Sequence, residues 1–126
     1  MKVLLVDDSK ILRRAIEMML VKAGHEVCTA ADGEEALKTA REEQPEAILL
    51  DMMLPGMTGP EVLKALKADP RTVEIPVIVS SSLSQKNEQK LMEDGAAGFL
   101  EKTALMLDQG ATTLVEAMEA ILHKHA

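Results

Sequence analysis

The stretch "KVLLVDDSK", residues 2–10, places a run of apolar residues directly before two adjacent aspartates. The apolar run is short, continuous and partly β-branched, which is typical of a strand buried on both faces of a parallel sheet. Ser9 is a suitable N-cap, and apolar residues recur at spacings of three and four over 9–23, as in an amphipathic helix. The stretch therefore predicts a buried strand that leads directly into a helix, with Asp7 and Asp8 at the junction.

The alternation of strand and helix continues along the chain. Further strands are expected over residues 26–30, 47–51, 77–80 and 97–101. Further helices are expected over residues 34–43, 61–68, 84–94 and 112–124. Strands that alternate with helices favour a parallel sheet covered on both faces, and right-handed crossovers make it a doubly wound α/β fold. The 126 residues, 47% of them hydrophobic, fit a single domain over 1–126.

Composition excludes several classes of protein. The net charge of −7 argues against direct nucleic-acid binding, which favours a basic face. The sequence has no apolar run near the roughly 18 residues of a transmembrane helix and no secretory signal pattern, so we expect no membrane partner. Cys28 is the only cysteine, which excludes an internal disulfide and favours the reducing cytoplasm; we expect it to be buried on the second strand. The three histidines, among them His25, lack metal-ligand spacing and are expected at the surface.

Polar side chains end four of the predicted strands, and in a doubly wound fold these ends converge on one crevice. The residues concerned are Asp7, Asp8, Asp51, Ser80, Ser81, Ser82, Glu101 and Lys102. Two carboxylates at ~4 Å repel each other by roughly 4 kcal/mol at an effective dielectric of about 20. Lys102 can offset only one charge, so the three aspartates favour a hard divalent cation such as Mg²⁺.

This set of groups suits phosphoryl transfer onto Asp51. A carboxylate can act as the nucleophile towards a phosphoryl group. A lysine and a serine hydroxyl can then contact the remaining phosphoryl oxygens. The strand ends therefore predict a site at which Asp51 is phosphorylated beside a metal ion.

Four sequence blocks resemble the receiver domain of bacterial two-component response regulators, the CheY-like family. They are "VLLVDDS", "ILLDMMLPGMTG", "IPVIVSSS" and "GAAGFLEK", at 3–9, 48–59, 75–82 and 95–102. The resemblance runs from about Val3 to Leu122. It implies a flavodoxin-like (βα)5 sheet with strand order 2-1-3-4-5. It also implies a signalling switch that catalyses only its own phosphorylation and dephosphorylation, and is not otherwise an enzyme.

The resemblance assigns roles to the residues of the predicted site. Asp51 is similar to the phospho-acceptor of the family. Asp8 and Asp51 are expected to bind Mg²⁺, or Mn²⁺, directly, and Asp7 through water. The backbone carbonyl of Met53 is a further expected metal ligand, and Lys102 is expected to contact the phosphoryl group.

The resemblance also implies a switch hydroxyl and an aromatic switch residue. Counting five residues on from Pro76 gives Ser81 as the switch hydroxyl, whereas counting back from Lys102 gives Ser80. Ser81 is preferred, because the register of a strand is harder to change than a surface loop is to shorten. Phe99, the only aromatic residue, occupies the place of the aromatic switch.

The family's partners follow from the same resemblance. A sensor histidine kinase or a histidine phosphotransfer protein would donate the phosphoryl group. A downstream effector protein or domain would bind the face made by the helix at 84–94, the strand at 97–101 and the helix at 112–124, and this face could also form a homodimer. Thr103 stands where the family usually has proline, so a pseudo-receiver that binds partners without phosphorylation is the alternative.

Two other folds of this class fit the residues less well. A phosphatase of the haloacid-dehalogenase type needs an acid two residues after its nucleophile, but Met53 and Ser9 stand at those positions. A flavodoxin needs a hydroxyl- and glycine-rich loop after the first strand, and "DDSKILRR" is not such a loop.

Two apolar positions beside the predicted site indicate slow loss of the phosphoryl group. In the family that the sequence resembles, the positions of Met53 and Leu83 flank the attacking water. Neither apolar side chain can orient that water by a hydrogen bond. We therefore expect slow dephosphorylation.

Overall fold

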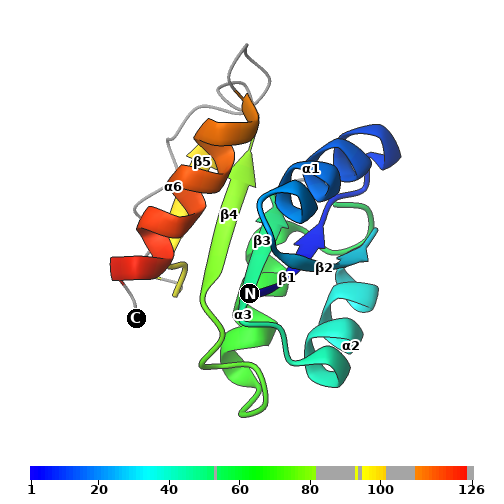
Figure 1. The fold of residues 1–126 in the computed structure, drawn as a ribbon. Helices are drawn as coiled ribbons and strands as arrows, with labels where there is room; N and C mark the ends of the chain where they lie inside the picture. The colour runs from blue at the N-terminus through cyan, green and yellow to red at the C-terminus, as the bar shows by residue number, and fades with distance from the viewer. Residues whose placement is uncertain (53, 82–92, 94, 102–109, 125–126) are drawn as a thin grey trace.

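The computed structural model describes residues 1–52, 54–81, 93, 95–101 and 110–124. Five parallel strands form one sheet in the order β2-β1-β3-β4-β5 (Figure 1). The strands are β1 (Lys2–Val6), β2 (Glu26–Ala30), β3 (Ala47–Asp51), β4 (Val77–Ser81) and β5 (Gly98–Glu101). The helices are α1 (Lys10–Lys22), α2 (Gly33–Glu43), α3 (Gly59–Ala68) and α6 (Gly110–Lys124). The predicted doubly wound fold and its strand order are confirmed, and the order reverses between β1 and β3.

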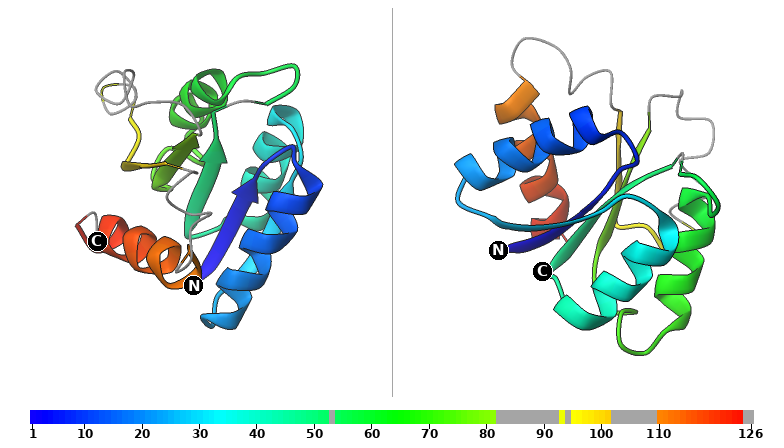
Figure 2. Two further views of the ribbon diagram at one scale, coloured as in Figure 1. Left: turned by 90° about the horizontal axis from the view of Figure 1, so that it is seen from above. Right: turned by 90° about the vertical axis from the view of Figure 1, so that its right-hand side faces the viewer.

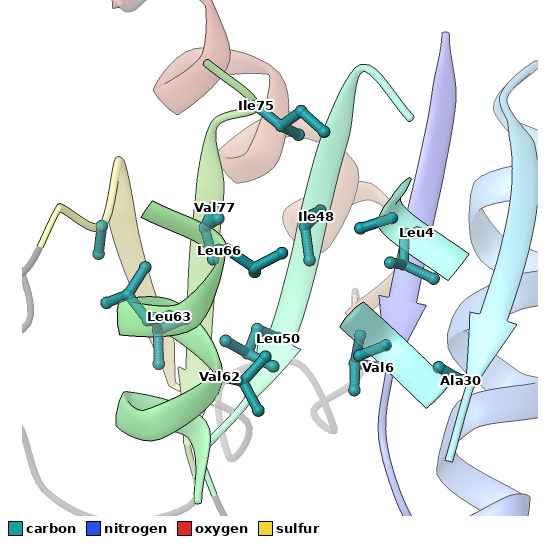
Figure 3. Close-up of a cluster of buried hydrophobic side chains, with 14 residues drawn as sticks. Leu4, Val6, Ala30, Ile48, Leu50, Val62, Leu63, Leu66, Ile75 and Val77 are labelled. Carbon is teal, nitrogen blue, oxygen red and sulfur yellow. The ribbon is translucent and has the colours of Figure 1, made fainter. Parts of the chain in front are cut away.

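Helices cover both faces of the sheet, as the right-hand view of Figure 2 shows. On one face, α2 and α3 pack on alternate residues of the central strands, such as Val6 and Leu50 (Figure 3). On the other face, α1 and α6 pack on the intervening residues, such as Leu5 and Leu49. The central strands are therefore buried on both sides, which explains their continuous apolar sequence.

The ends of the helices follow local capping chemistry. The Ser9 side chain accepts a hydrogen bond from the Leu12 N–H, as expected of the N-cap of α1. Helix α3 begins two residues earlier than predicted, because Pro60 is tolerated in the first turn and Thr58 forms a capping box with Glu61.

Three other expectations meet different outcomes. The predicted helix over 84–94 lies, apart from Glu93, outside the described residues. Cys28 is only half-buried on the edge strand β2. The surface prediction for His25 is wrong: its side chain is 10% exposed, and its Nε2 lies 3.5 Å from Glu119 Oε1 on α6.

Candidate metal centre at the carboxyl edge of the sheet

Three aspartates meet where β1 and β3 end. Carboxylate oxygens of Asp7, Asp8 and Asp51 all lie within 4.8 Å of one another. Asp7 and Asp51 are 1% and 3% exposed, whereas Asp8 is exposed. The cause is the sheet register, since Val6 pairs with Leu50 and the next residue on each strand is an aspartate. The convergence expected of these three aspartates is thus present in the fold.

The junction between β1 and α1 holds Asp7 from several sides. Its backbone N–H donates to the Ala30 carbonyl (3.1 Å), and its Oδ1 accepts from the Ser9 N–H (2.9 Å). Its carbonyl oxygen accepts from Nη1 of Arg13 (2.7 Å). Side chain and backbone of Asp7 are therefore both anchored, and Asp8 projects from the same short segment.

The junction between β3 and α3 fixes the backbone around Asp51. The Met52 N–H donates to the Ser80 carbonyl (2.9 Å), and the Gly59 N–H donates to the Met52 carbonyl (2.9 Å). A Cβ at Gly59 would lie 2.7 Å from the carbonyl oxygen of Asp51 and 2.6 Å from Cα of Met52. Only glycine lets the start of α3 pack this closely against the end of β3.

The serines and the aromatic residue lie on the next two strands. Ser80 pairs in register with Asp51 and is 4% exposed, while Ser81 pairs with Glu101. Phe99 is half-buried, pairs with Val79 and packs against the cluster under α2 and α3. The choice between Ser80 and Ser81 as switch hydroxyl stays a prediction.

Several predicted site residues fall outside the described residues: Met53, Leu83, Lys102 and Thr103. Conversely, sequence reasoning missed Arg13, which donates to the Asp7 carbonyl, and Gly59, whose N–H donates to the carbonyl of Met52, the residue after Asp51. Arg13 lies six residues after Asp7, and no spacing rule for helices or strands links the two.

The chemistry of the acid cluster fits a hard divalent cation. All its donors are carboxylate oxygens, the ligands that Mg²⁺ prefers. The three carboxylates lie close enough together for more than one of them to contact a single ion of this kind, directly or through a water.

No helix among the described residues is both long enough and apolar enough to cross a membrane. Among the described residues, the three aspartates are also the one group of His, Cys, Asp or Glu side chains with spacing suited to a metal ion.

Comparisons with known proteins agree with this geometry. The family model of the response regulator receiver domain matches residues 3–119. Protein PilH of Pseudomonas aeruginosa is 32% identical over 122 residues, which cover 96% of this chain and 97% of PilH. Among solved structures, the chemotaxis response regulator CheY4 of Vibrio cholerae superimposes with a TM-score of 0.85 at 34% identity, over 95% of this chain and 97% of that one.

Longer relatives match only through part of their length. The transcriptional regulatory protein AfsQ1 of Streptomyces coelicolor is 38% identical over 79% of this chain but only 43% of its own length. The response regulator PleD of Caulobacter vibrioides is 41% identical over 80% of this chain and 22% of its own length. The chain thus spans less than half of these two relatives. From the fold, the acid cluster and the match over 3–119, the chain belongs to the response regulator receiver domain family.

Proposed function

We propose that this chain is a phosphoryl-accepting switch of a two-component phosphorelay, with Asp51 as the acceptor. The observation that carries the proposal is the position of Asp51, a nearly buried carboxylate at the end of β3 and within 4.8 Å of two further carboxylates. An Asp51 oxygen attacks the phosphorus of a phosphohistidine on a kinase or phosphotransfer protein. The P–N bond breaks, and the histidine nitrogen keeps the electron pair.

The acid cluster is the proposed metal site for this reaction. Asp8 and Asp51 bind Mg²⁺, or Mn²⁺, directly, Asp7 binds through water, and the Met53 carbonyl completes the protein ligands. A divalent cation held there would offset the charge of the carboxylates and of the phosphoryl oxygens. Hydrogen bonds hold Asp7 and the backbone of Met52 next to Asp51, which supports this role, because ligands already held in place lose little conformational entropy on binding.

Lys102 is the proposed cation that contacts the incoming phosphoryl oxygens. A hydroxyl at the end of β4, Ser81 or Ser80, is proposed to hydrogen-bond the phosphoryl group after transfer. Ser80 lies beside Asp51 in the sheet, and Ser81 is the next residue along β4.

The output is a change in the face made by residues 84–94, β5 and α6. Movement of the β4 hydroxyl towards the phosphoryl group leaves space into which Phe99 can rotate. The half-buried position of Phe99 next to Val79 supports this step, because the side chain already borders the core. An effector protein or domain, or a second copy of the chain, then binds the phosphorylated form more tightly than the free form.

A pseudo-receiver that binds a partner without phosphorylation is the second candidate. The residue that favours it is Thr103, in place of the family's usual proline. The compact acid cluster argues against it, because three neighbouring carboxylates are costly to keep without a function that needs them.

Intact mass spectrometry separates the two candidates. The protein is incubated with acetyl phosphate and Mg²⁺, beside Asp51→Asn and a sample with excess EDTA. The switch predicts one added phosphoryl group on the unmutated protein with metal, and none in either control. A mass unchanged under every condition would favour the pseudo-receiver.

A further inference from the structure

The side chain of Arg13 reaches back from the first turns of α1 to the acid pair. Its Nη1 donates to the carbonyl oxygen of Asp7 at 2.7 Å, and this hydrogen bond is partly buried. The Arg13 backbone N–H also donates to the Ser9 carbonyl at 2.8 Å, so the base of the side chain is fixed by the helix. The guanidinium group therefore ties α1 to the end of β1.

The acceptor of this hydrogen bond belongs to the peptide that joins the two aspartates. The carbonyl of Asp7 and the N–H of Asp8 form one planar unit, which contains both Cα atoms. An anchored carbonyl oxygen thus limits rotation of the whole unit and sets the direction in which each side chain leaves it. A charged, planar guanidinium makes a stronger and more directional bond than a neutral donor.

The positive charge of Arg13 should weaken cation binding at the acid cluster, whereas its hydrogen bond to the Asp7 carbonyl should favour it. Arg13 lines a small pocket of about 150 Å³ with Lys10, Arg14, Glu17 and Thr29, next to the junction. A cation at this place repels a divalent cation in the acid cluster. If charge alone mattered, removal of Arg13 would strengthen metal binding.

Arg14 provides a matched control for that charge. It lines the same pocket and carries the same charge. In the part of the chain that the structure describes, its side chain makes no hydrogen bond to the Asp7–Asp8 junction. Arg14 therefore carries the same charge beside the same pocket but lacks the contact with Asp7.

We propose that Arg13 is a positioning residue, which sets the divalent-cation affinity of the acid cluster by anchoring the Asp7–Asp8 peptide. The inference rests on the proposed metal site. Arg13 touches neither metal nor phosphoryl group in this role, and it acts only through the backbone that carries Asp7 and Asp8. Groups that orient metal ligands in this way typically change affinity by about 10–100-fold when removed.

The test is the Mg²⁺ dissociation constant of four proteins, measured by calorimetry or by amide chemical shifts. The unmutated protein is compared with Arg13→Met, Arg13→Lys and Arg14→Met, and the free energy of unfolding of each is measured in EDTA. We expect Arg13→Met to bind Mg²⁺ about 10-fold more weakly. Arg13→Lys keeps a charged donor and should recover part of the loss, whereas Arg14→Met should bind Mg²⁺ at least as tightly as the unmutated protein.

The outcomes distinguish this inference from the proposed function. If the unmutated protein does not bind Mg²⁺, the proposed metal site is wrong, and the role of Arg13 is wrong with it. If the unmutated protein binds but Arg13→Met binds within twofold, or if both arginine variants lose affinity equally, only the inference is overturned. If Arg13→Met does not fold in EDTA, Arg13→Gln replaces it, because its side chain is shorter and neutral. The expected loss of Mg²⁺ affinity and the refuting result are the same.

Discussion

Replacing Gly59 with alanine is expected to destabilise the protein, although alanine is the better helix residue. Without a steric conflict, glycine to alanine in a helix gains about 0.5–1 kcal/mol. Here the added Cβ would lie 2.6 Å from Cα of Met52 and 2.7 Å from the carbonyl oxygen of Asp51. Unbonded carbon atoms prefer about 3.5–4.0 Å, so the start of α3 and the end of β3 must separate by about 1 Å.

The size of the effect follows from these two opposing terms. Overpacking of this kind costs about 1–3 kcal/mol, and the conflict here is with backbone atoms that cannot rotate away. The cost therefore lies in the upper part of that range, and after the helix gain is subtracted we expect Gly59→Ala to lower the free energy of unfolding by about 1–2.5 kcal/mol. The same displacement moves the backbone of Asp51, so phosphorylation by acetyl phosphate should also slow.

Urea unfolding followed by circular dichroism measures the change, and Gly33→Ala is the matched control. Gly33 also begins a helix, but a Cβ there would meet Cβ of Met57 at 2.7 Å and a methyl group of Val62 at 2.8 Å. The Val62 methyl can rotate, and Met57 lies in the irregular connection between β3 and α3 rather than in a strand of the sheet. The control should therefore lose less stability than Gly59→Ala. A Gly59→Ala protein as stable as the unmutated one, or more stable, would refute the argument from close backbone packing.

Three further predictions concern residues on and beyond the acid cluster. Lys67→Met should lower the free energy of unfolding by about 1–2 kcal/mol, because the Lys67 ammonium donates to two carbonyls of the α3–β4 connection at 2.8 and 3.1 Å. Burial lowers the pKa of Lys67 in the folded state. The unfolded chain therefore keeps this proton to higher pH than the folded protein does, so the free energy of unfolding should rise with pH between the folded pKa and about 10.4. Urea titrations of Lys67→Met should lack this rise. Asp8→Asn should raise the melting temperature in EDTA, because it removes like-charge repulsion. Mg²⁺ at 100 times its dissociation constant should stabilise the unmutated protein by about 2.7 kcal/mol, and this added stability should be lost in Asp8→Asn. A full Mg²⁺ response in this variant would contradict the metal assignment. Met53→Asn should speed dephosphorylation about tenfold, because one hydrogen bond to the attacking water that lowers the barrier by about 1.4 kcal/mol raises the rate by that factor. An unchanged rate of phosphate release would contradict the slow-loss hypothesis.

The sequence was sufficient to predict the fold because its signals are local. Continuous apolar strands such as β1 and β3 alternate with helices of clear period, and right-handed crossovers leave few ways to assemble them. The convergence of Asp7, Asp8 and Asp51 follows directly, since the carboxyl ends of neighbouring parallel strands share one edge. Helix α3 begins two residues before the predicted start at Glu61, because Thr58 caps it and proline suits a first turn.

Contacts between distant segments could not be predicted in this way. The hydrogen bond from Arg13 to Asp7 depends on where the first turns of α1 place a long side chain. The close approach of Gly59 to Asp51 depends on the path of the β3–α3 connection. His25 was expected at the surface because it lies at a turn and lacks metal-ligand spacing, but its Nε2 lies 3.5 Å from Glu119 Oε1 on α6.

The most direct test of the account is to locate the phosphoryl group on the chain. The protein is treated with acetyl phosphate and Mg²⁺, reduced with borohydride, which converts an aspartyl phosphate to homoserine, and mapped by peptide mass spectrometry. Phosphorylation of Asp51 predicts homoserine at position 51, dependent on Mg²⁺ and confined to that position. Modification at Asp7 or Asp8, or reduction at no aspartate, would contradict the claim that Asp51 is the phosphoryl acceptor.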